Sequence, residues 1–359
     1  MNAGAPVPFA DVVIAAHDPQ RAVGRAVASV LDGGGDDVRV TVVAHGIDPD
    51  LLAPELGVLS EDPRLRVVRF DDGVRSPAGP FNHGLGLATA VYVGVMGSDD
   101  FLEPGAMGEW IAHLRARGSD YLIAALRNQD GAVWRDPLTR RGRHGDLDLV
   151  RDRLAYRAAP LGLIRRDLLP PDRPALTPGL ATGEDIEWGL ELAALDGRID
   201  VGVGLGAYVI GADAPQRITL EARSLDAELE ALRLLARREW LHRLSSRRRR
   251  AIAIKLWRMN VVPAVIVRAD APWSPEALAA LAEVTAWLEA LAPRARRSLG
   301  RSERWIADAA LQPTAASLDA SVARARRAGT IDRVLTRNPL RALGTDAPLR
   351  RVLRLRTPA

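Results

Sequence analysis

The first 126 residues of this chain alternate short apolar runs with helix-like segments, and this alternation constrains the fold more than any other feature. The runs are rich in β-branched residues, which favour strands, whereas the segments between them repeat apolar residues every three to four positions. The runs occupy residues 11–16, 38–46, 65–73, 91–97 and 121–126. Strands that alternate with helices at these lengths predict βαβ units, and therefore an α/β fold with a mostly parallel, Rossmann-like sheet flanked by helices.

The pattern changes further along the chain. Residues 128–160 are polar and irregular, and residues 199–213 are typical of a strand. From about Ser224 onward, apolar residues fall on one face of a helix; they are Leu225, Leu229, Leu232, Ala236, Trp240 and Leu244. We therefore expect two domains, an α/β domain over 1–222 and a basic, mainly α-helical domain over 223–359.

The charge is divided unevenly between these two regions. Residues 225–359 hold 26 Lys+Arg and 13 Asp+Glu, a balance of +13, and the remaining 23 and 32 give residues 1–224 a balance of −9. Such a split favours an anionic surface or ligand for the basic region. A general preference for Arg is the alternative explanation, because Lys255 is the single lysine of the chain.

Composition also limits the chemistry and the compartment. The chain has no cysteine, which excludes disulfides, thiolate catalysis and Cys-based zinc sites. The apolar stretch near the N-terminus is too short for a signal peptide, and no segment approaches the roughly 20 apolar residues that span a bilayer. We therefore expect a cytoplasmic protein.

Polar residues follow three of the expected strands at the point where each strand ends. They are His17-Asp18-Pro19, Ala44-His45-Gly46 and Gly97-Ser98-Asp99-Asp100. In open α/β sheets, ligands bind beyond the carboxyl ends of the strands. We therefore expect these residues to line one crevice.

Asp99 and Asp100 are the first candidates for chemistry within this crevice. Two adjacent carboxylates can hold a hard divalent cation through their oxygens, and the cation can neutralise charge on a departing diphosphate. The alternative is a structural role, either in an Asx turn or as the cap of a helix that begins near Pro104.

Glu184 and Asp185 are the second candidates. A carboxylate near a helix start in the same crevice could accept a proton from an attacking hydroxyl. The alternative is that the two acids stabilise the positive end of a helix, with Thr182 as its N-cap.

The order and spacing of four segments resemble the family 2 inverting glycosyltransferases, which have the GT-A nucleotide-diphosphosugar transferase fold. The segments are residues 11–31, 69–107, 160–199 and 207–219, so the resemblance covers roughly residues 10–220. It implies a single displacement at the anomeric carbon of a nucleotide-diphosphosugar, with inversion of configuration.

By position, the resemblance implies roles for seven residues. Asp100 would bind Mn²⁺ or Mg²⁺, Asp99 would face the ribose or the metal, and Asp185 would be the general base. The remaining four would belong to the donor site; they are His17, Asp18, His45 and Asn82.

The chain departs from the family pattern in two places. The strand before Asp99 has Gly97 or Ser98 where the family has an earlier Asp, and the second strand ends in Ala44-His45-Gly46 where the family has Asp-Asp-Gly. A neutral His can donate or accept one hydrogen bond, but it lacks the carboxylate charge. Because these carboxylates are missing, the chain could instead be a weakly active or inactive module that binds a sugar nucleotide or glycan. A nucleotidyltransferase is a third alternative.

The resemblance implies a nucleotide-diphosphosugar donor and a glycan or lipid-linked acceptor of the cell envelope. The basic C-terminal helices could contact anionic lipid at the inner face of the membrane, with Trp257 and Trp273 at the interface. Alternatively, Arg247–Arg250 form a solvated connector between helices, or the tail mediates dimerisation. We expect no nucleic acid as partner, because aromatic residues make up only 4% of the chain and are not interleaved with the basic run.

Overall fold

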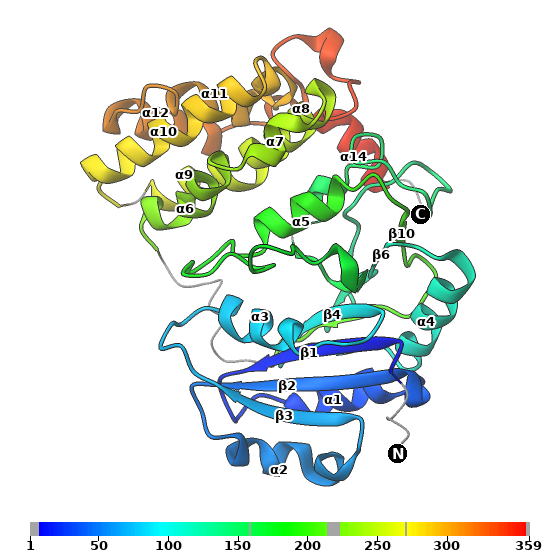
Figure 1. Ribbon diagram of the computed structural model, residues 1–359. Helices are drawn as coiled ribbons and strands as arrows, with labels where there is room; N and C mark the ends of the chain where they lie inside the picture. The colour runs from blue at the N-terminus through cyan, green and yellow to red at the C-terminus, as the bar shows by residue number, and fades with distance from the viewer. Residues whose placement is uncertain (1–6, 158, 214–222, 270, 357–359) are drawn as a thin grey trace. The chain divides into compact units, whose positions relative to one another are not determined.

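The computed structural model describes residues 7–157, 159–213, 223–269 and 271–356 (Figure 1). The chain forms two compact units. The first comprises Met1–Arg135, Arg143–Leu147 and Ala159–Leu220, and the second comprises Asp136–Gly142, Asp148–Ala158 and Glu221–Ala359. Two short segments from the first half of the chain therefore group with the C-terminal helices.

A seven-stranded sheet forms the centre of the first unit, with the order β10-β6-β9-β4-β1-β2-β3. Its strands are β1 (Ala10–Ala16), β2 (Val38–His45), β3 (Leu65–Phe70), β4 (Tyr92–Gly97), β6 (Tyr121–Ile123), β9 (Gly162–Arg165) and β10 (Ile199–Val201). All neighbours pair in parallel except β9, which runs antiparallel to both β4 and β6. The expected α/β fold with a mostly parallel sheet is confirmed.

The two faces of the sheet are covered by different helices because side chains alternate along each strand. Val12 and Ile14 of β1 belong to the core that contains α1 (Val23–Leu31). Val13 points the other way, toward α3 (Ala78–Gly86), where a Cβ on Gly84 would lie 2.3 Å from its side chain. A glycine at position 84 thus lets α3 pack close to the strands whose ends form the site.

A smaller sheet extends the first unit, with the order β5-β11-β7-β8. Its strands are β5 (Phe101–Leu102), β7 (Leu126–Asn128), β8 (Val133–Trp134) and β11 (Tyr208–Ile210). The stretch 199–213 was expected to be one strand, but it forms β10 and β11 in different sheets. The interruption lies at Gly202–Gly206, where Gly204 adopts a φ of 87° that a branched strand residue would avoid.

The second unit is built from helices. They are α6 (Leu225–Ala236), α7 (Glu239–Arg243), α8 (Ser246–Leu256), α9 (Val262–Arg268), α10 (Pro275–Leu291), α11 (Arg301–Ala309), α12 (Ala315–Arg326), α13 (Thr330–Val334) and α14 (Pro348–Arg356). The first unit also contains α2 (Ala53–Leu56), α4 (Ala106–Arg117) and α5 (Ile186–Ala193). Leucines of α6 and α10, such as Leu229 and Leu288, are fully buried and form part of the helical core.

Two expectations for the basic region are wrong. Arg247–Arg250 do not connect helices but lie within α8, whose N-terminus is capped by the Ser245 hydroxyl through the Arg248 amide. Trp257 is completely buried, so its indole cannot lie at a membrane interface.

A buried arginine explains why residues 148–158 group with the C-terminal helices. The Arg258 guanidinium donates to the Tyr156 hydroxyl at 2.5 Å, to Glu303 Oε1 at 3.0 Å and to the Ser298 carbonyl at 3.1 Å. A buried charge needs such partners, since removing it from water is unfavourable unless it is paired and hydrogen-bonded. Tyr156 therefore fastens this segment to the helical unit.

Candidate active site

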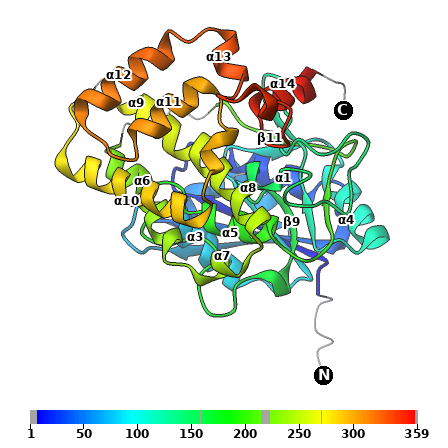
Figure 2. The same ribbon diagram turned by 90° about the horizontal axis from the view of Figure 1, so that it is seen from above.

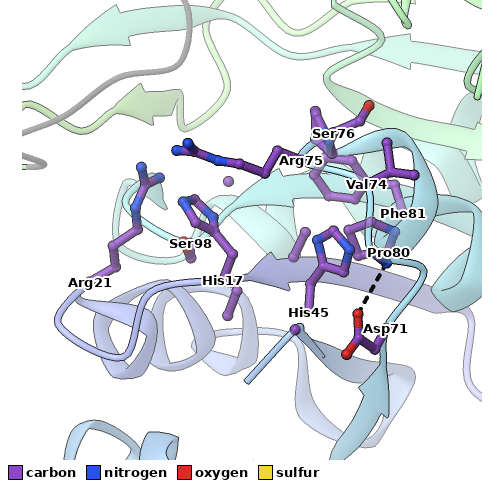
Figure 3. Close-up of a pocket in the computed structure, with 16 residues that line it drawn as sticks. His17, Arg21, His45, Asp71, Val74, Arg75, Ser76, Pro80, Phe81 and Ser98 are labelled. Carbon is purple, nitrogen blue, oxygen red and sulfur yellow. Dashed lines mark hydrogen bonds between the residues drawn. The ribbon is translucent and has the colours of Figure 1, made fainter. Parts of the chain in front are cut away.

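The ends of four neighbouring strands form one pocket in the first unit, with a volume of about 430 Å³ (Figure 3). Ala16 ends β1 and His17 follows it, His45 ends β2, Asp71 follows β3, and Gly97 ends β4. These strands are adjacent in the order β4-β1-β2-β3 and run in parallel, so their carboxyl ends meet at one edge. His17 and His45 are thereby brought together as the sequence predicted.

The opposite wall of the pocket was not anticipated from the sequence. It consists of the turn after β3 and the start of α3, and its apolar members are Val74, Pro77, Pro80 and Phe81. The turn is held by its own carboxylates, because Asp71 Oδ1 accepts from the Gly73 amide at 3.1 Å and Asp72 Oδ1 from the Val74 amide at 3.0 Å. The signal was the Asp-Asp-Gly that follows an apolar run, which places these residues at the same sheet edge.

The charged groups that line the pocket are predominantly positive. Arg21 and Arg75 both line it, and Asp71 is the only acidic residue among its described lining residues. In Figure 3 the side chains of Arg21 and Arg75 both extend toward the His17 imidazole. Partial burial, reinforced by the charge of Arg21, lowers the pKa of His17, so its imidazole is neutral near pH 7. The pocket therefore suits an anionic ligand with an apolar part.

His45 contacts a carboxylate that the sequence analysis did not consider. Its Nε2 lies 2.8 Å from Asp72 Oδ1. Burial alone would raise the pKa of Asp72, but the hydrogen bonds from His45 and from the Val74 amide outweigh it and lower the pKa. The end of β2 lacks its own carboxylate, and the end of β3 supplies two at the same edge.

Asp99 and Asp100 converge at the end of β4. A Cβ built on Gly97 would lie 2.8 Å from Asp100 Oδ2 and 3.3 Å from Asp99 Oδ1, so both carboxylates turn back toward this glycine. Neither acid is among the described residues that line the pocket, but Gly97 is, and so is Arg21, which bonds Asp99, so the acid pair adjoins the rim of the pocket. A side chain at position 97 would occupy the space of the carboxylates. The glycine therefore leaves room for the carboxylates to lie as they do.

Both acids have partners within the first unit. Asp100 Oδ2 accepts from the Tyr208 hydroxyl at 2.5 Å and Oδ1 from the Gly211 amide at 2.9 Å, while Asp99 Oδ1 accepts from Arg21 at 3.1 Å. Burial, together with the charge of Asp100, raises the pKa of Tyr208, which keeps its phenol protonated as a donor. The helix-cap alternative does not hold, since α4 has Gly105 at its N-cap and no side-chain cap.

Asp18 and Asn82 have hydrogen bonds of their own and do not appear among the residues that line the pocket. Asp18 Oδ1 accepts from the Gln20 amide at 2.9 Å and so shapes the loop between β1 and α1. The Asn82 amide forms two bonds with the backbone of Leu176, at 2.8 Å to its carbonyl and 2.9 Å from its amide. Asn82 therefore tethers the distant segment at Leu176 to α3.

Asp185 occupies the N-cap position of α5, but its side chain makes no capping hydrogen bond. The expectation of Thr182 as N-cap is wrong, because the helix begins at Ile186. Asp185 is not among the residues that line the pocket. Its loop is nevertheless linked to the pocket wall, since the Thr177 amide donates to the Glu184 carbonyl at 2.8 Å and Leu176 is held by Asn82.

Among the residues that the structure describes, no group of three or more His, Asp or Glu side chains is arranged to hold a metal ion. The candidate donors are therefore the two carboxylates at Gly97. Each carboxylate oxygen has two lone pairs, so oxygens that already accept one hydrogen bond can still bind a cation. The donor set is hard and oxygen-only, as Mg²⁺ and Mn²⁺ prefer.

The mostly parallel seven-stranded sheet, together with the smaller sheet and the flanking helices, forms a GT-A type fold. The structure superimposes on S. aureus TarS 1–349 in complex with UDP-GlcNAc with a TM-score of 0.73 at 17% identity, over 89% of this chain and 91% of that chain. TarS 1–349 without that ligand gives a TM-score of 0.70 over the same shares.

Residues 11–173 match the family model of glycosyl transferase family 2. The chain is 31% identical over 112 residues to the succinoglycan biosynthesis protein ExoU of Rhizobium meliloti (strain 1021). It is 32% identical over 120 residues to the succinoglycan biosynthesis protein ExoO of the same strain. These matches span about a third of this chain, and they cover 32% and 34% of the two relatives.

No helix in the described part of the chain is both long enough and apolar enough to cross a membrane.

Proposed function

We propose that this chain is a family 2 glycosyltransferase, which transfers a sugar from a nucleoside-diphosphate sugar to a hydroxyl of a glycan or lipid-linked acceptor of the cell envelope, with inversion at the anomeric carbon. The observation that carries the proposal is the positively charged pocket at the ends of β1 to β4, with the Asp99–Asp100 pair at its rim. The TarS structure contains UDP-GlcNAc, and the two matched relatives are named for succinoglycan biosynthesis, which supports the donor and acceptor classes.

The pocket has the chemistry to hold the donor. Arg21 and Arg75 would bind the diphosphate, because guanidinium groups pair with phosphate through strong charge-assisted hydrogen bonds. The apolar wall at Phe81 would contact the nucleobase, and the imidazoles of His17 and His45 would each offer one hydrogen bond. Asp18 and Asn82 would act indirectly, by shaping the loop after β1 and by holding Leu176.

Asp99 and Asp100 would hold Mn²⁺ or Mg²⁺, which would neutralise the charge that develops on the departing diphosphate. The chain itself prepares this site. Tyr208 and the Gly211 amide fix the Asp100 carboxylate, and Arg21 connects Asp99 to the cationic pocket.

Asp185 would accept the proton of the acceptor hydroxyl. The acceptor oxygen then forms a bond to the anomeric carbon as the bond to the nucleoside diphosphate breaks on the opposite side, which inverts the configuration. This role requires the loop before α5 to present Asp185 to the acceptor. The tether from Asn82 to Leu176 and the bond between Thr177 and Glu184 support such a placement.

A second candidate function is a binding module without turnover. It is favoured by one observation: both Asp100 oxygens already accept hydrogen bonds from the chain. In that case the pocket would bind a sugar nucleotide, but no nucleoside diphosphate would be released.

A donor screen tests the proposal and separates the two candidates. Thermal unfolding is measured with a panel of nucleoside diphosphates, with and without Mn²⁺, since a ligand that binds only the folded state raises the midpoint. Nucleoside diphosphate release from the matching sugar donors is then followed with glycan acceptors. Stabilisation with release supports the transferase, stabilisation without release supports the binding module, and neither result would refute a sugar-nucleotide site.

A further inference from the structure

We propose that the second unit carries a docking surface for anionic phospholipid, formed by an arginine-lined pair of hollows and the leucine-bearing turn beside them. The inference deepens the proposed envelope function by locating a membrane-binding surface. Its test measures lipid binding without donor or turnover, so the two proposals can fail separately.

Helix α11 packs against α12 and α13 (Figure 2). Two hollows are lined by residues of these helices and of the segments before α11 and after α13. Their volumes are about 470 and 350 Å³, and Arg304 and Arg337 line both. Seven arginines line the two hollows together, against two aspartates, Asp308 and Asp332. The lining thus has an excess of five positive charges, which favours anions over any neutral ligand.

Three acids pair with four of the seven arginines. Glu289 Oε1 lies 2.7 Å from Arg296, and Asp332 Oδ1 lies 3.5 Å from Arg301. Asp308 pairs with Arg304 at 2.6 Å, also pairs with Arg296, and lies 3.8 Å from Arg337. One carboxylate therefore serves three guanidinium groups.

The other three of the seven arginines have no acidic partner within the described part of the chain; they are Arg297, Arg324 and Arg341. Arg324 instead lies over the Trp305 ring at 3.9 Å, which fixes its position without cancelling its charge. These groups remain able to bind phosphate.

Exposed leucines stand on the turn that borders the second hollow. Leu340 is 92% exposed and Leu343 is 64% exposed. Arg337 and Arg341, which line that hollow, lie within three residues of Leu340 in the chain. Two large apolar side chains flanked by arginines are the composition of a surface that inserts at a bilayer interface.

The turn is held firmly, so the leucines do not belong to a loose loop. The Asn338 side chain accepts from the Leu340 amide at 3.1 Å, and the buried Thr336 hydroxyl donates to the Asn338 carbonyl at 2.7 Å. Ala342 lies between Leu340 and Leu343 in the chain, and its burial holds the turn in place. The turn thus keeps the Leu340 side chain exposed to water. Burial of this side chain at the acyl-chain boundary of a bilayer would be favourable, whereas a hydrophilic polyanion would not bury it.

Vesicle co-sedimentation of the full chain tests the proposal. We expect binding to vesicles of phosphatidylcholine with roughly one third phosphatidylglycerol, weakened by salt, and little binding to phosphatidylcholine alone. Leu340→Ser/Leu343→Ser and Arg337→Gln/Arg341→Gln should each lower the partition coefficient at least about tenfold.

Matched controls remove similar groups elsewhere. Leu51→Ser/Val58→Ser changes two exposed apolar residues of the first unit, and Arg237→Gln/Arg243→Gln changes two exposed arginines of the second. Both controls should bind within about twofold of wild type, and all variants should keep the wild-type unfolding midpoint.

The proposal is overturned if anionic vesicles do not bind, if the site variants bind like the controls, or if the controls lose binding equally. The hollows would instead be a binding site for a soluble polyanion if polyphosphate binds, vesicles do not, and Leu340→Ser/Leu343→Ser leaves polyphosphate binding unchanged.

Discussion

The phenol of Tyr208 donates a 2.5 Å hydrogen bond to Asp100 Oδ2, joining residues 108 positions apart. Through this bond the middle of the smaller sheet fixes the carboxylate at the end of β4. The relationship also explains why a fully buried tyrosine keeps a polar group inside the core, where such a group must be paired.

Tyr208→Phe should lower both the stability of the fold and the stabilisation that Mn²⁺ with nucleoside diphosphate provides. Loss of a hydrogen bond to a charged group should lower the free energy of unfolding by about 1–3 kcal/mol and free Asp100 to move. Chemical denaturation with and without Mn²⁺ plus nucleoside diphosphate measures both effects. Tyr92→Phe is the control, because the Tyr92 hydroxyl bonds the Ser119 carbonyl at 2.8 Å away from the acid pair. If Mn²⁺ with nucleoside diphosphate stabilises the two variants equally, Tyr208 has no role in the site.

Removing the charge of Arg75 should reduce donor affinity. We expect Arg75→Gln to weaken binding of a nucleoside diphosphate about tenfold, since a hydrogen bond to a charged group contributes about 1.5–3 kcal/mol. Arg69→Gln is the matched control, because Arg69 is an exposed arginine of β3 that does not line the pocket. Isothermal titration measures both, and a similar loss in the control would point to general charge rather than to the pocket.

The lowered pKa of His17 should make stability depend on pH. The folded state holds the imidazole neutral, so the unfolded chain binds its proton more readily. Stability from this group is therefore fully present above the unfolded pKa of about 6.5 and falls as pH drops through it.

His17→Asn should accordingly lose less stability than wild type between about pH 7.5 and pH 5.5. His242→Asn, which removes an exposed histidine, should follow the wild-type profile. Unfolding midpoints across this range provide the measurement, and parallel curves for all three proteins would contradict the assigned environment of His17.

Asn82→Ala should release the segment that leads to Asp185. The nitrogen and the oxygen of the Asn82 side-chain amide both bond the Leu176 backbone. Without these bonds we expect faster hydrogen exchange over residues 176–185 and a lower transfer rate. Nucleoside diphosphate affinity should change little. Asn128→Ala, which removes a bond to the exposed Trp134 indole, is the control. Unchanged exchange in Asn82→Ala would show that the tether does not position this loop.

Much of the first unit could be predicted because its information is local. The β-branched runs became β1 to β4, and the rule that parallel strands end at one edge brought His17 and His45 together. The rest depends on long-range contacts that leave no periodic signal. Tyr156 joins the helical unit through Arg258, 102 residues away, and the antiparallel β9 inserts between β4 and β6.

The site, too, has a part that the sequence predicts and a part that it does not. The turn after β4 places Asp99 and Asp100 beside Gly97, which lines the pocket, whereas their role in metal binding stays a prediction. The wall from Asp71 to Phe81 was not predicted, because the family pattern has its carboxylates at the end of the second strand, whereas this chain has two after β3. Only the spatial pairing of His45 with Asp72 reveals that exchange.

The central claim is that Asp185 takes the acceptor proton while the pocket and the Asp99–Asp100 pair hold the donor. Asp185→Asn tests it most directly, with Asp172→Asn, an exposed acid before the tethered segment, as control. We expect Asp185→Asn to bind donor like wild type but to release nucleoside diphosphate at least about 100-fold more slowly with acceptor present, as loss of a general base does. Wild-type turnover in Asp185→Asn, with donor binding intact, would contradict the account.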